Sequence, residues 1–221
     1  MNSILSYQPK KTEKAAIFLH GYGSCGEDLY SLLPDLKKAL PNTAFYFPTA
    51  PEHTDEQGYQ WFDLSDYTPS CFSLEYLDVL TKRALEKINI INQLIEYVQQ
   101  ENKLNSSQIS LAGFSQGGLM AVLTALLRHD TVEKAVSLSG LPLYFGRYLK
   151  TQEVVSSPPL LFIQGTQDDI VPLKSLRLTK DGLKKAAVAA RFEEIPAMGH
   201  EINADALFSL VSFLKESVKK E

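Results

Sequence analysis

A serine set between glycines is the strongest chemical signal in the sequence. Residues 113–118 read GFSQGG and lie between an apolar stretch and a strongly apolar segment. At a tight turn from a strand into a helix, glycines avoid steric collision, and the serine is held in a strained conformation that exposes its hydroxyl. The helix N-terminus behind it offers free N–H groups to a developing oxyanion. The other interpretation is a glycine-rich turn with an incidental serine, but the flanking pattern favours Ser115 as a nucleophile.

The second requirement is a base, because a serine hydroxyl is a poor nucleophile at neutral pH. In proteins with this turn, an acid and then a histidine follow the serine along the chain. His200 comes directly after a predicted strand, whereas His129 ends the helix that begins at the serine and would lie about 20 Å away. His20 and His53 precede the serine. His200 is therefore the predicted base.

Two adjacent aspartates compete as the acid that orients this base. Asp168 and Asp169 lie in the loop after the predicted strand at residues 159–163. Neighbouring side chains of an extended segment point to opposite sides, so only one of the two can face the histidine. The residues alone leave both candidates open.

The segment HGYG at residues 20–23 directly follows the first predicted strand. Its glycines let the backbone approach a ligand closely, and a loop of this type supplies the second oxyanion donor beside such a serine. We predict that the backbone N–H groups of Tyr22 and Gln116 bind the oxyanion, and that His20 holds the loop by hydrogen bonds. The other interpretation is a plain turn that ends a strand.

All of these candidates lie where predicted strands and helices meet. Short apolar runs predict strands at residues 14–19, 43–47, 108–112, 134–138, 159–163 and 191–195, and apolar periodicity predicts helices at 27–40, 74–104, 116–127, 175–190 and 203–218. Residues 49–70 have no clean period and form a long loop, of a kind that is usually functional. The alternation indicates an α/β protein whose mostly parallel sheet is covered by helices on both faces. With no repeat or linker in the sequence, we expect one domain over residues 1–221.

The composition of the 221 residues, 44% hydrophobic and 22% charged, is that of a soluble globular protein. Lysine and arginine number 22 against 26 aspartates and glutamates, a net charge of −4, which argues against nucleic acid as a partner. No apolar run reaches the ~20 residues of a membrane span, and residues 1–9 lack the basic and apolar regions of a signal peptide. Cys25 and Cys71 are too few for a disulfide framework. We therefore expect a cytoplasmic protein without a transmembrane segment.

The order of these motifs resembles that of the phospholipase/carboxylesterase family, which has the α/β-hydrolase fold and includes acyl-protein thioesterases. The matching segments are LHGYG, WFD, GFSQGG, GTQD with IVP, and GH, at residues 19–23, 61–63, 113–118, 165–168 with 170–172, and 199–200. The resemblance implies Ser115 as nucleophile, His200 as base and Asp168 as acid. It also implies the Tyr22 and Gln116 amides as oxyanion donors, and neither a metal nor an organic cofactor.

Four apolar residues near these motifs are the predicted substrate contacts: Trp61, Phe62, Leu141 and Met198. The resemblance implies a groove bordered by the WFD segment. The loop at 59–73 and the segment at 141–145 also gather aromatic and aliphatic residues beside polar ones, which favours an apolar acyl groove between them. Ordinary core packing is the other interpretation of these side chains.

The predicted function is hydrolysis of a carboxylic ester or thioester through an acyl-enzyme, as in carboxylesterases and acyl-protein thioesterases. A lysophospholipase would use the same residues, and a binding protein on a hydrolase scaffold is the alternative outside catalysis. The expected partner is a small-molecule or acylated substrate rather than nucleic acid, and a homodimer is left open. The leaving group and the acyl-chain length do not follow from the sequence.

Overall fold

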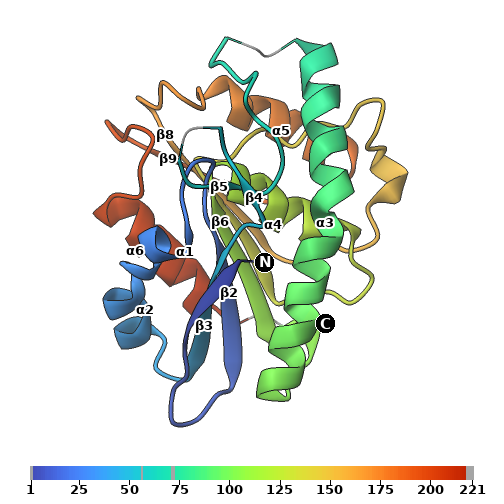
Figure 1. The fold of residues 1–221 in the computed structure, drawn as a ribbon. Helices are drawn as coiled ribbons and strands as arrows, with labels where there is room; N and C mark the ends of the chain where they lie inside the picture. Colours follow the sequence, from blue (N-terminus) through green and yellow to red (C-terminus); the bar gives the residue numbers. More distant parts are fainter. Residues whose placement is uncertain (1, 56, 71–72, 218–221) are drawn as a thin grey trace.

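A seven-stranded sheet forms the centre of the computed structural model, which describes residues 2–55, 57–70 and 73–217 (Figure 1). Its strand order is β1-β3-β2-β6-β7-β8-β9, and β1 alone among them pairs antiparallel. The strands are β1 (Ser3–Tyr7), β2 (Lys14–Leu19), β3 (Thr43–Thr49), β6 (Ile109–Phe114), β7 (Lys134–Leu138), β8 (Leu160–Gly165) and β9 (Arg191–Ile195). The short strands β4 (Glu52–His53) and β5 (Tyr59–Gln60) pair as a separate hairpin.

Helices cover both faces of this sheet (Figure 1). One face carries α1 (Gly26–Tyr30), α2 (Leu33–Ala39) and α6 (Ala204–Lys215), and the other carries α3 (Leu74–Asn102), α4 (Gln116–Leu127) and α5 (Lys174–Lys185). Single 3-10 turns lie at Ser106–Gln108 and Thr151–Glu153. The two cores are apolar clusters on opposite sides of the strands, which confirms the predicted mostly parallel sheet between two helical layers.

The central helix α4 is apolar all round because it is almost wholly enclosed. It packs on β6, β7 and α3, and every residue from Gln116 to Leu126 is buried. The longer α3 is amphipathic, with a buried stripe that includes Leu80, Ile91 and Val98 against the core and polar residues on its outer side. Packing against α3, β6 and β7 therefore holds α4 in a fixed position relative to the sheet.

The predicted helix over residues 27–40 divides into α1 and α2. Pro34 lies in the first turn of α2, where its missing N–H is tolerated, but it cannot donate the hydrogen bond that would continue a helix from Tyr30. The structure also adds β1, an edge strand absent from the predicted elements, which pairs over its whole length with residues 45–49 of β3. β3 accordingly runs past Phe47 to Thr49, and Pro48 is accepted there because pairing with β2 ends at Tyr46.

Four of the parallel strands lead into predicted site residues at the carboxyl edge of the sheet. β2 leads into the HGYG segment, β6 into Ser115, β8 into the loop with Asp168, and β9 into the loop with His200. In sheets of this type the ligand site lies at the carboxyl ends of the strands. The topology therefore gathers residues that are as much as 180 positions apart, counted from 20 to 200, at one end of the molecule.

Candidate active site

Ser115 lies at a strained turn between β6 and α4. Its φ is 53° and its ψ is −117°, a backbone conformation that residues other than glycine rarely adopt, and its N–H donates to the Leu138 carbonyl at 2.9 Å. A Cβ at Gly113 would lie 2.1 Å from the Gly117 carbonyl oxygen, and one at Gly117 would lie 2.1 Å from the Leu19 carbonyl oxygen. Both flanking positions therefore require glycine, as the motif predicts.

The HGYG segment lies directly against this serine. A Cβ added to Gly21 would come within 3.2 Å of the Ser115 Cβ, so the backbone of the segment and the serine side chain are neighbours. Gln116 is the first residue of α4, where N–H groups have no partner within the helix. The two predicted oxyanion donors, at Tyr22 and Gln116, thus belong to segments that flank Ser115 on either side.

His20 has the structural role that the sequence predicts. It is fully buried, its Nδ1 lies 2.7 Å from the Gly21 carbonyl oxygen, and its Nε2 accepts a hydrogen bond from the Ala50 N–H at 3.0 Å. Because Nε2 is an acceptor, the proton of the neutral ring lies on Nδ1. Burial lowers the pKa of His20, despite the opposing effect of its bond to Gly21.

The structure brings Asp168, and not Asp169, to His200. Asp168 is 6% exposed and its Oδ2 lies 2.8 Å from the His200 Nδ1, whereas Asp169 is exposed. The loop that carries both aspartates consists of turns and bends rather than an extended segment, so its side chains need not alternate in direction. What selects Asp168 is its hydrogen bonding to the loop itself.

Four donors hold the Asp168 carboxylate. Oδ1 accepts from the backbone N–H groups of Ile170 at 3.1 Å and Val171 at 2.8 Å, and Oδ2 accepts from Gln164 Nε2 at 2.8 Å as well as facing His200. Burial by itself would raise the pKa of Asp168. The hydrogen bonds from His200 and from the Val171 N–H outweigh burial and hold that pKa below its ordinary value.

Ser115 and His200 line one cavity of about 330 Å³. Its apolar walls include Leu29, Leu32 and Ile202, and its polar lining includes Asp28 and Glu201. The Phe114 ring packs on the imidazole of His200 with 4.7 Å between ring centroids. The cavity lies between the α1 region and the His200 loop, beside the carboxyl ends of β2 and β6.

The four predicted substrate contacts lie elsewhere, in the packed core. Their exposed fractions are small, and none of them lines this cavity: Trp61 0%, Phe62 1%, Leu141 4% and Met198 1%. The sequence alone does not distinguish an aromatic loop residue that packs in the core from one that lines a groove. The expectation that these side chains contact substrate is corrected accordingly, and residues 71–72 of the expected groove lie outside the described residues.

The WFD segment instead contacts the site through the side chain of Gln116, a contact that the sequence does not predict. The Gln116 carboxamide accepts a hydrogen bond from the Trp61 N–H at 2.8 Å and donates one to the Phe62 carbonyl at 2.6 Å. The Trp61 indole N–H donates to the His20 carbonyl at 2.9 Å. Trp61 and Phe62 thereby join the serine turn to the HGYG segment. Contacts of this kind depend on the fold and cannot be predicted from the sequence.

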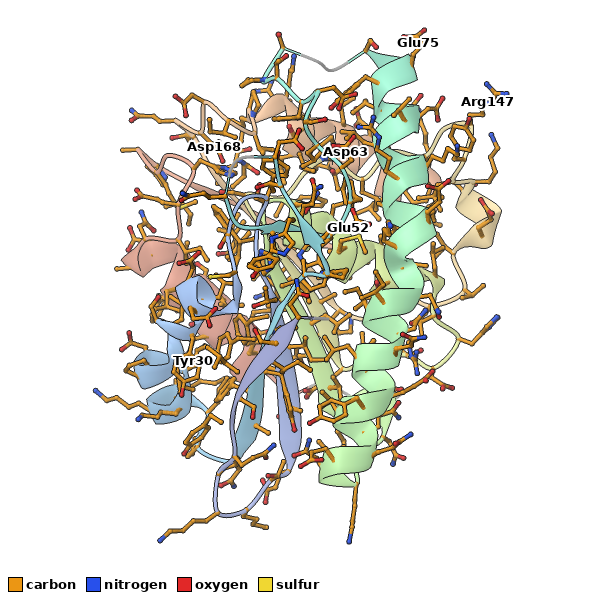
Figure 2. The ribbon with its side chains drawn as sticks, viewed as in Figure 1. Tyr30, Glu52, Asp63, Glu75, Arg147 and Asp168 are labelled. Carbon is orange, nitrogen blue, oxygen red and sulfur yellow. The ribbon has the colours of Figure 1, made fainter. Side chains whose placement is uncertain are left out.

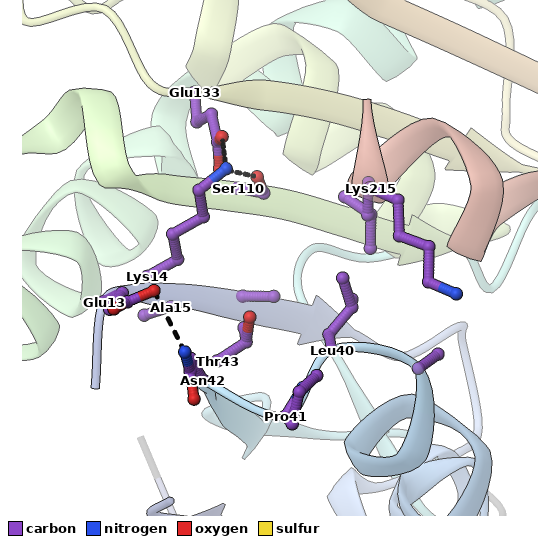
Figure 3. A pocket seen from close by; sticks show the side chains of 13 residues that line it. Glu13, Lys14, Ala15, Leu40, Pro41, Asn42, Thr43, Ser110, Glu133 and Lys215 are labelled. Carbon is purple, nitrogen blue, oxygen red and sulfur yellow. Dashed lines mark hydrogen bonds and ion pairs between the residues drawn. The ribbon is translucent and has the colours of Figure 1, made fainter. Parts of the chain in front are cut away.

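A second cavity, of about 190 Å³, lies at the opposite edge of the sheet, where β2 and β3 begin (Figure 3). Lys14 forms an ion pair there with Glu133, which also accepts a hydrogen bond from the Ser110 hydroxyl at 3.1 Å. None of the predicted site residues lines it.

Across the part of the chain that the structure describes, no cluster of three or more histidine, cysteine, aspartate or glutamate side chains is arranged to hold a metal ion. No helix within those same residues has the length and apolar character needed to span a membrane.

Comparison with known proteins gives consistent matches over nearly the whole chain. The sequence model of the phospholipase/carboxylesterase family matches residues 3–218. Acyl-protein thioesterase 1 of Cryptococcus neoformans is 27% identical over 97% of each chain, and carboxylesterase SOBER1 of Arabidopsis thaliana is 26% identical over 92% of this chain and 90% of its own. The crystal structure of esterase PE8 superposes with a TM-score of 0.83 at 27% identity, covering 96% of both chains. These likenesses confirm the predicted α/β-hydrolase fold.

Proposed function

The chain belongs to the phospholipase/carboxylesterase family, and we propose that it hydrolyses carboxylic esters or thioesters through an acyl-enzyme on Ser115. One observation carries the proposal: a strained serine and a histidine line the same cavity, and a buried aspartate holds that histidine at 2.8 Å. Relatives named as acyl-protein thioesterase and carboxylesterase support the same chemistry.

In the first half-reaction the Ser115 Oγ attacks the acyl carbonyl and His200 takes its proton. Because Nδ1 of His200 faces Asp168, the nitrogen left for the serine proton is Nε2. The lowered pKa of Asp168 keeps its carboxylate charged, so it stabilises the imidazolium that forms. His200 then returns the proton to the departing alcohol or thiol, and water repeats the sequence to release the acid.

The tetrahedral oxyanion binds to the backbone N–H groups of Tyr22 and Gln116. The close approach of Gly21 to Ser115 supports this assignment, as does the position of Gln116 at the N-terminus of α4. Such donors are fixed before the reaction starts and need no rearrangement when the negative charge develops. The carboxamide of Gln116, which bridges to the Trp61 and Phe62 backbone, fixes the orientation of this residue further.

The cavity favours an uncharged acyl ester or thioester over a lysophospholipid. Leu29, Leu32 and Ile202 offer apolar surface to an acyl chain, while Asp28 and Glu201 place negative charge at the same cavity. A phosphate on the leaving group would be repelled by both carboxylates, since like charges nearby are unfavourable. The cytoplasm is the proposed location of this reaction.

Labelling by a fluorophosphonate and hydrolysis of p-nitrophenyl esters test the proposal together. Ser115→Ala should abolish labelling and lower kcat by several orders of magnitude, because members of a triad act as a unit. Ser107→Ala, which changes an exposed serine beside the amino end of β6, is the matched control and should behave as the wild type. More than ~10% residual activity in Ser115→Ala would exclude Ser115 as the nucleophile. Comparing kcat/KM for acyl esters and acyl thioesters of rising length then identifies the leaving group.

A further inference from the structure

One hydrogen bond joins the segment after Trp61 to the loop that holds Asp168. The Tyr67 hydroxyl donates to the Ile170 carbonyl at 2.7 Å, across 103 positions of sequence. Figure 2 shows Asp63 and Asp168 at the same end of the molecule, which is where these two segments meet. The mechanism proposed above assigns no part to this contact.

The accepting carbonyl belongs to the peptide unit that also holds the aspartate. The Ile170 C=O and the Val171 N–H are the two ends of one planar amide, and this N–H donates to Asp168 Oδ1 at 2.8 Å. A hydrogen bond accepted by the carbonyl polarises the amide and strengthens the bond that its N–H donates. A continuous chain therefore runs from the Tyr67 hydroxyl through the amide to Asp168, and from Asp168 Oδ2 to His200 Nδ1 at 2.8 Å.

Tyr67 is itself held in place by its neighbours. Its N–H donates to the Leu64 carbonyl at 2.9 Å. The adjacent Asp66 accepts two hydrogen bonds from the Arg83 guanidinium, at 2.7 and 3.1 Å, and one from the Tyr76 hydroxyl at 3.1 Å. Arg83 and Tyr76 belong to α3, so the position of the tyrosine is fixed by a long helix packed on the core.

We propose that Tyr67 is a positioning residue for Asp168, acting through the amide between Ile170 and Val171. It orients the carboxylate toward the His200 Nδ1 and does not touch the substrate. The inference rests on the proposed function, because it requires Asp168 to act as the acid. A purely structural contact, which we call a latch, would instead stabilise the loop and leave the chemical step unchanged.

Tyr67→Phe removes the hydroxyl and keeps the ring. The expected result is a two- to fivefold fall in kcat on p-nitrophenyl esters, about the effect of one neutral hydrogen bond, with KM unchanged. The acid-side midpoint of the kcat/KM profile should move to lower pH, because a less ordered carboxylate supports the imidazolium less well. Tyr97→Phe is the matched control and should leave kcat and the midpoint unchanged, because Tyr97 is an exposed tyrosine of α3 whose ring packs against Tyr46. A lower Tm in Tyr67→Phe with kcat and midpoint as in the wild type overturns the proposal and leaves a latch.

The same substitution in an Asp168→Asn background identifies the route. If Tyr67 acts through Asp168, its effect on kcat disappears once the carboxylate is gone, because the two changes are then not additive. A loss of equal size in both backgrounds overturns the proposal. Wild-type activity in Asp168→Asn alone would instead refute the acid assignment on which the proposed function depends, so the two failures are distinguishable.

Discussion

The two edges of the sheet each hold a buried carboxylate near a cavity, but only at the carboxyl edge is that carboxylate paired with a histidine. At the amino edge, Glu133 is paired with Lys14 and the Ser110 hydroxyl, and these groups satisfy one another. At the carboxyl edge, Asp168 is paired with His200, whose other face is turned to a cavity that also contains the strained Ser115. A buried charge by itself therefore identifies nothing. What distinguishes the site is a carboxylate that serves a second titratable group at the cavity wall.

Removing the charge at the carboxyl edge should have the largest effect on activity. Asp168→Asn should lower kcat by up to about four orders of magnitude, because an amide favours the wrong tautomer of the imidazole. Asp169→Asn changes an exposed neighbour and should cost less than twofold. Steady-state kinetics of both variants on one ester decide the matter. A severe loss at position 169 with a mild loss at 168 would contradict the geometry of the loop.

The equivalent change at the amino edge should affect stability and leave catalysis intact. Glu133→Gln keeps an acceptor for Ser110 but removes the charge that faces Lys14. The Glu133 side chain is 7% exposed and that of Lys14 is 42% exposed, so we expect a loss of about 1–2 kcal/mol in the free energy of unfolding rather than the cost of a fully buried pair. Urea unfolding measures it, and kcat should stay within twofold of the wild type. A tenfold fall in kcat without a change in stability would show that this edge takes part in catalysis.

The sequence predicts the carboxyl edge well because its signals are local. Glycines at 113 and 117 report a turn that admits no side chain, and the strongly apolar α4 that follows was predicted with its observed bounds. The order of the proposed nucleophile, acid and base along the chain then follows from the topology of the fold. Family resemblance chose Asp168 over its neighbour, and the reason is visible only in the structure, where backbone donors surround that carboxylate.

Features that depend on tertiary proximity could not be predicted. β1 is a short edge strand with mixed polarity, and it forms because β3 offers it an unpaired side. Trp61 and Phe62 lie in a polar loop, and their place in the core depends on hydrogen bonds to the Gln116 carboxamide. That group is 55 positions from Trp61 and 54 from Phe62 in the sequence. The contact between Tyr67 and Ile170 has the same character: Ile170 belongs to the IVP segment, but Tyr67 is part of no motif, and only the folded chain brings the two together.

The carboxyl edge also buries an uncharged histidine, His20, which should make a small contribution to the pH dependence of stability. The folded-state pKa of His20 lies below the ordinary value of about 6.5, chiefly because burial disfavours the charged ring. The unfolded chain therefore binds more protons than the folded one once the pH falls below about 6.5, and the free energy of unfolding must decline there. Above about 6.5 both states hold a neutral ring, and the contribution is constant.

His20→Gln keeps a side-chain acceptor within reach of the Ala50 N–H but cannot take up a proton. We expect this variant to be less stable at pH 7, because the ring packing against Trp61 is lost, and to lose less further stability than the wild type between pH 7 and 5. His129→Gln, at an exposed position, should keep the wild-type slope. The carboxylate of Asp168 does not interfere in this window, since its lowered pKa moves its own contribution to pH values below about 4. An unchanged slope in His20→Gln would show that the acid sensitivity of stability over this range arises from groups other than His20.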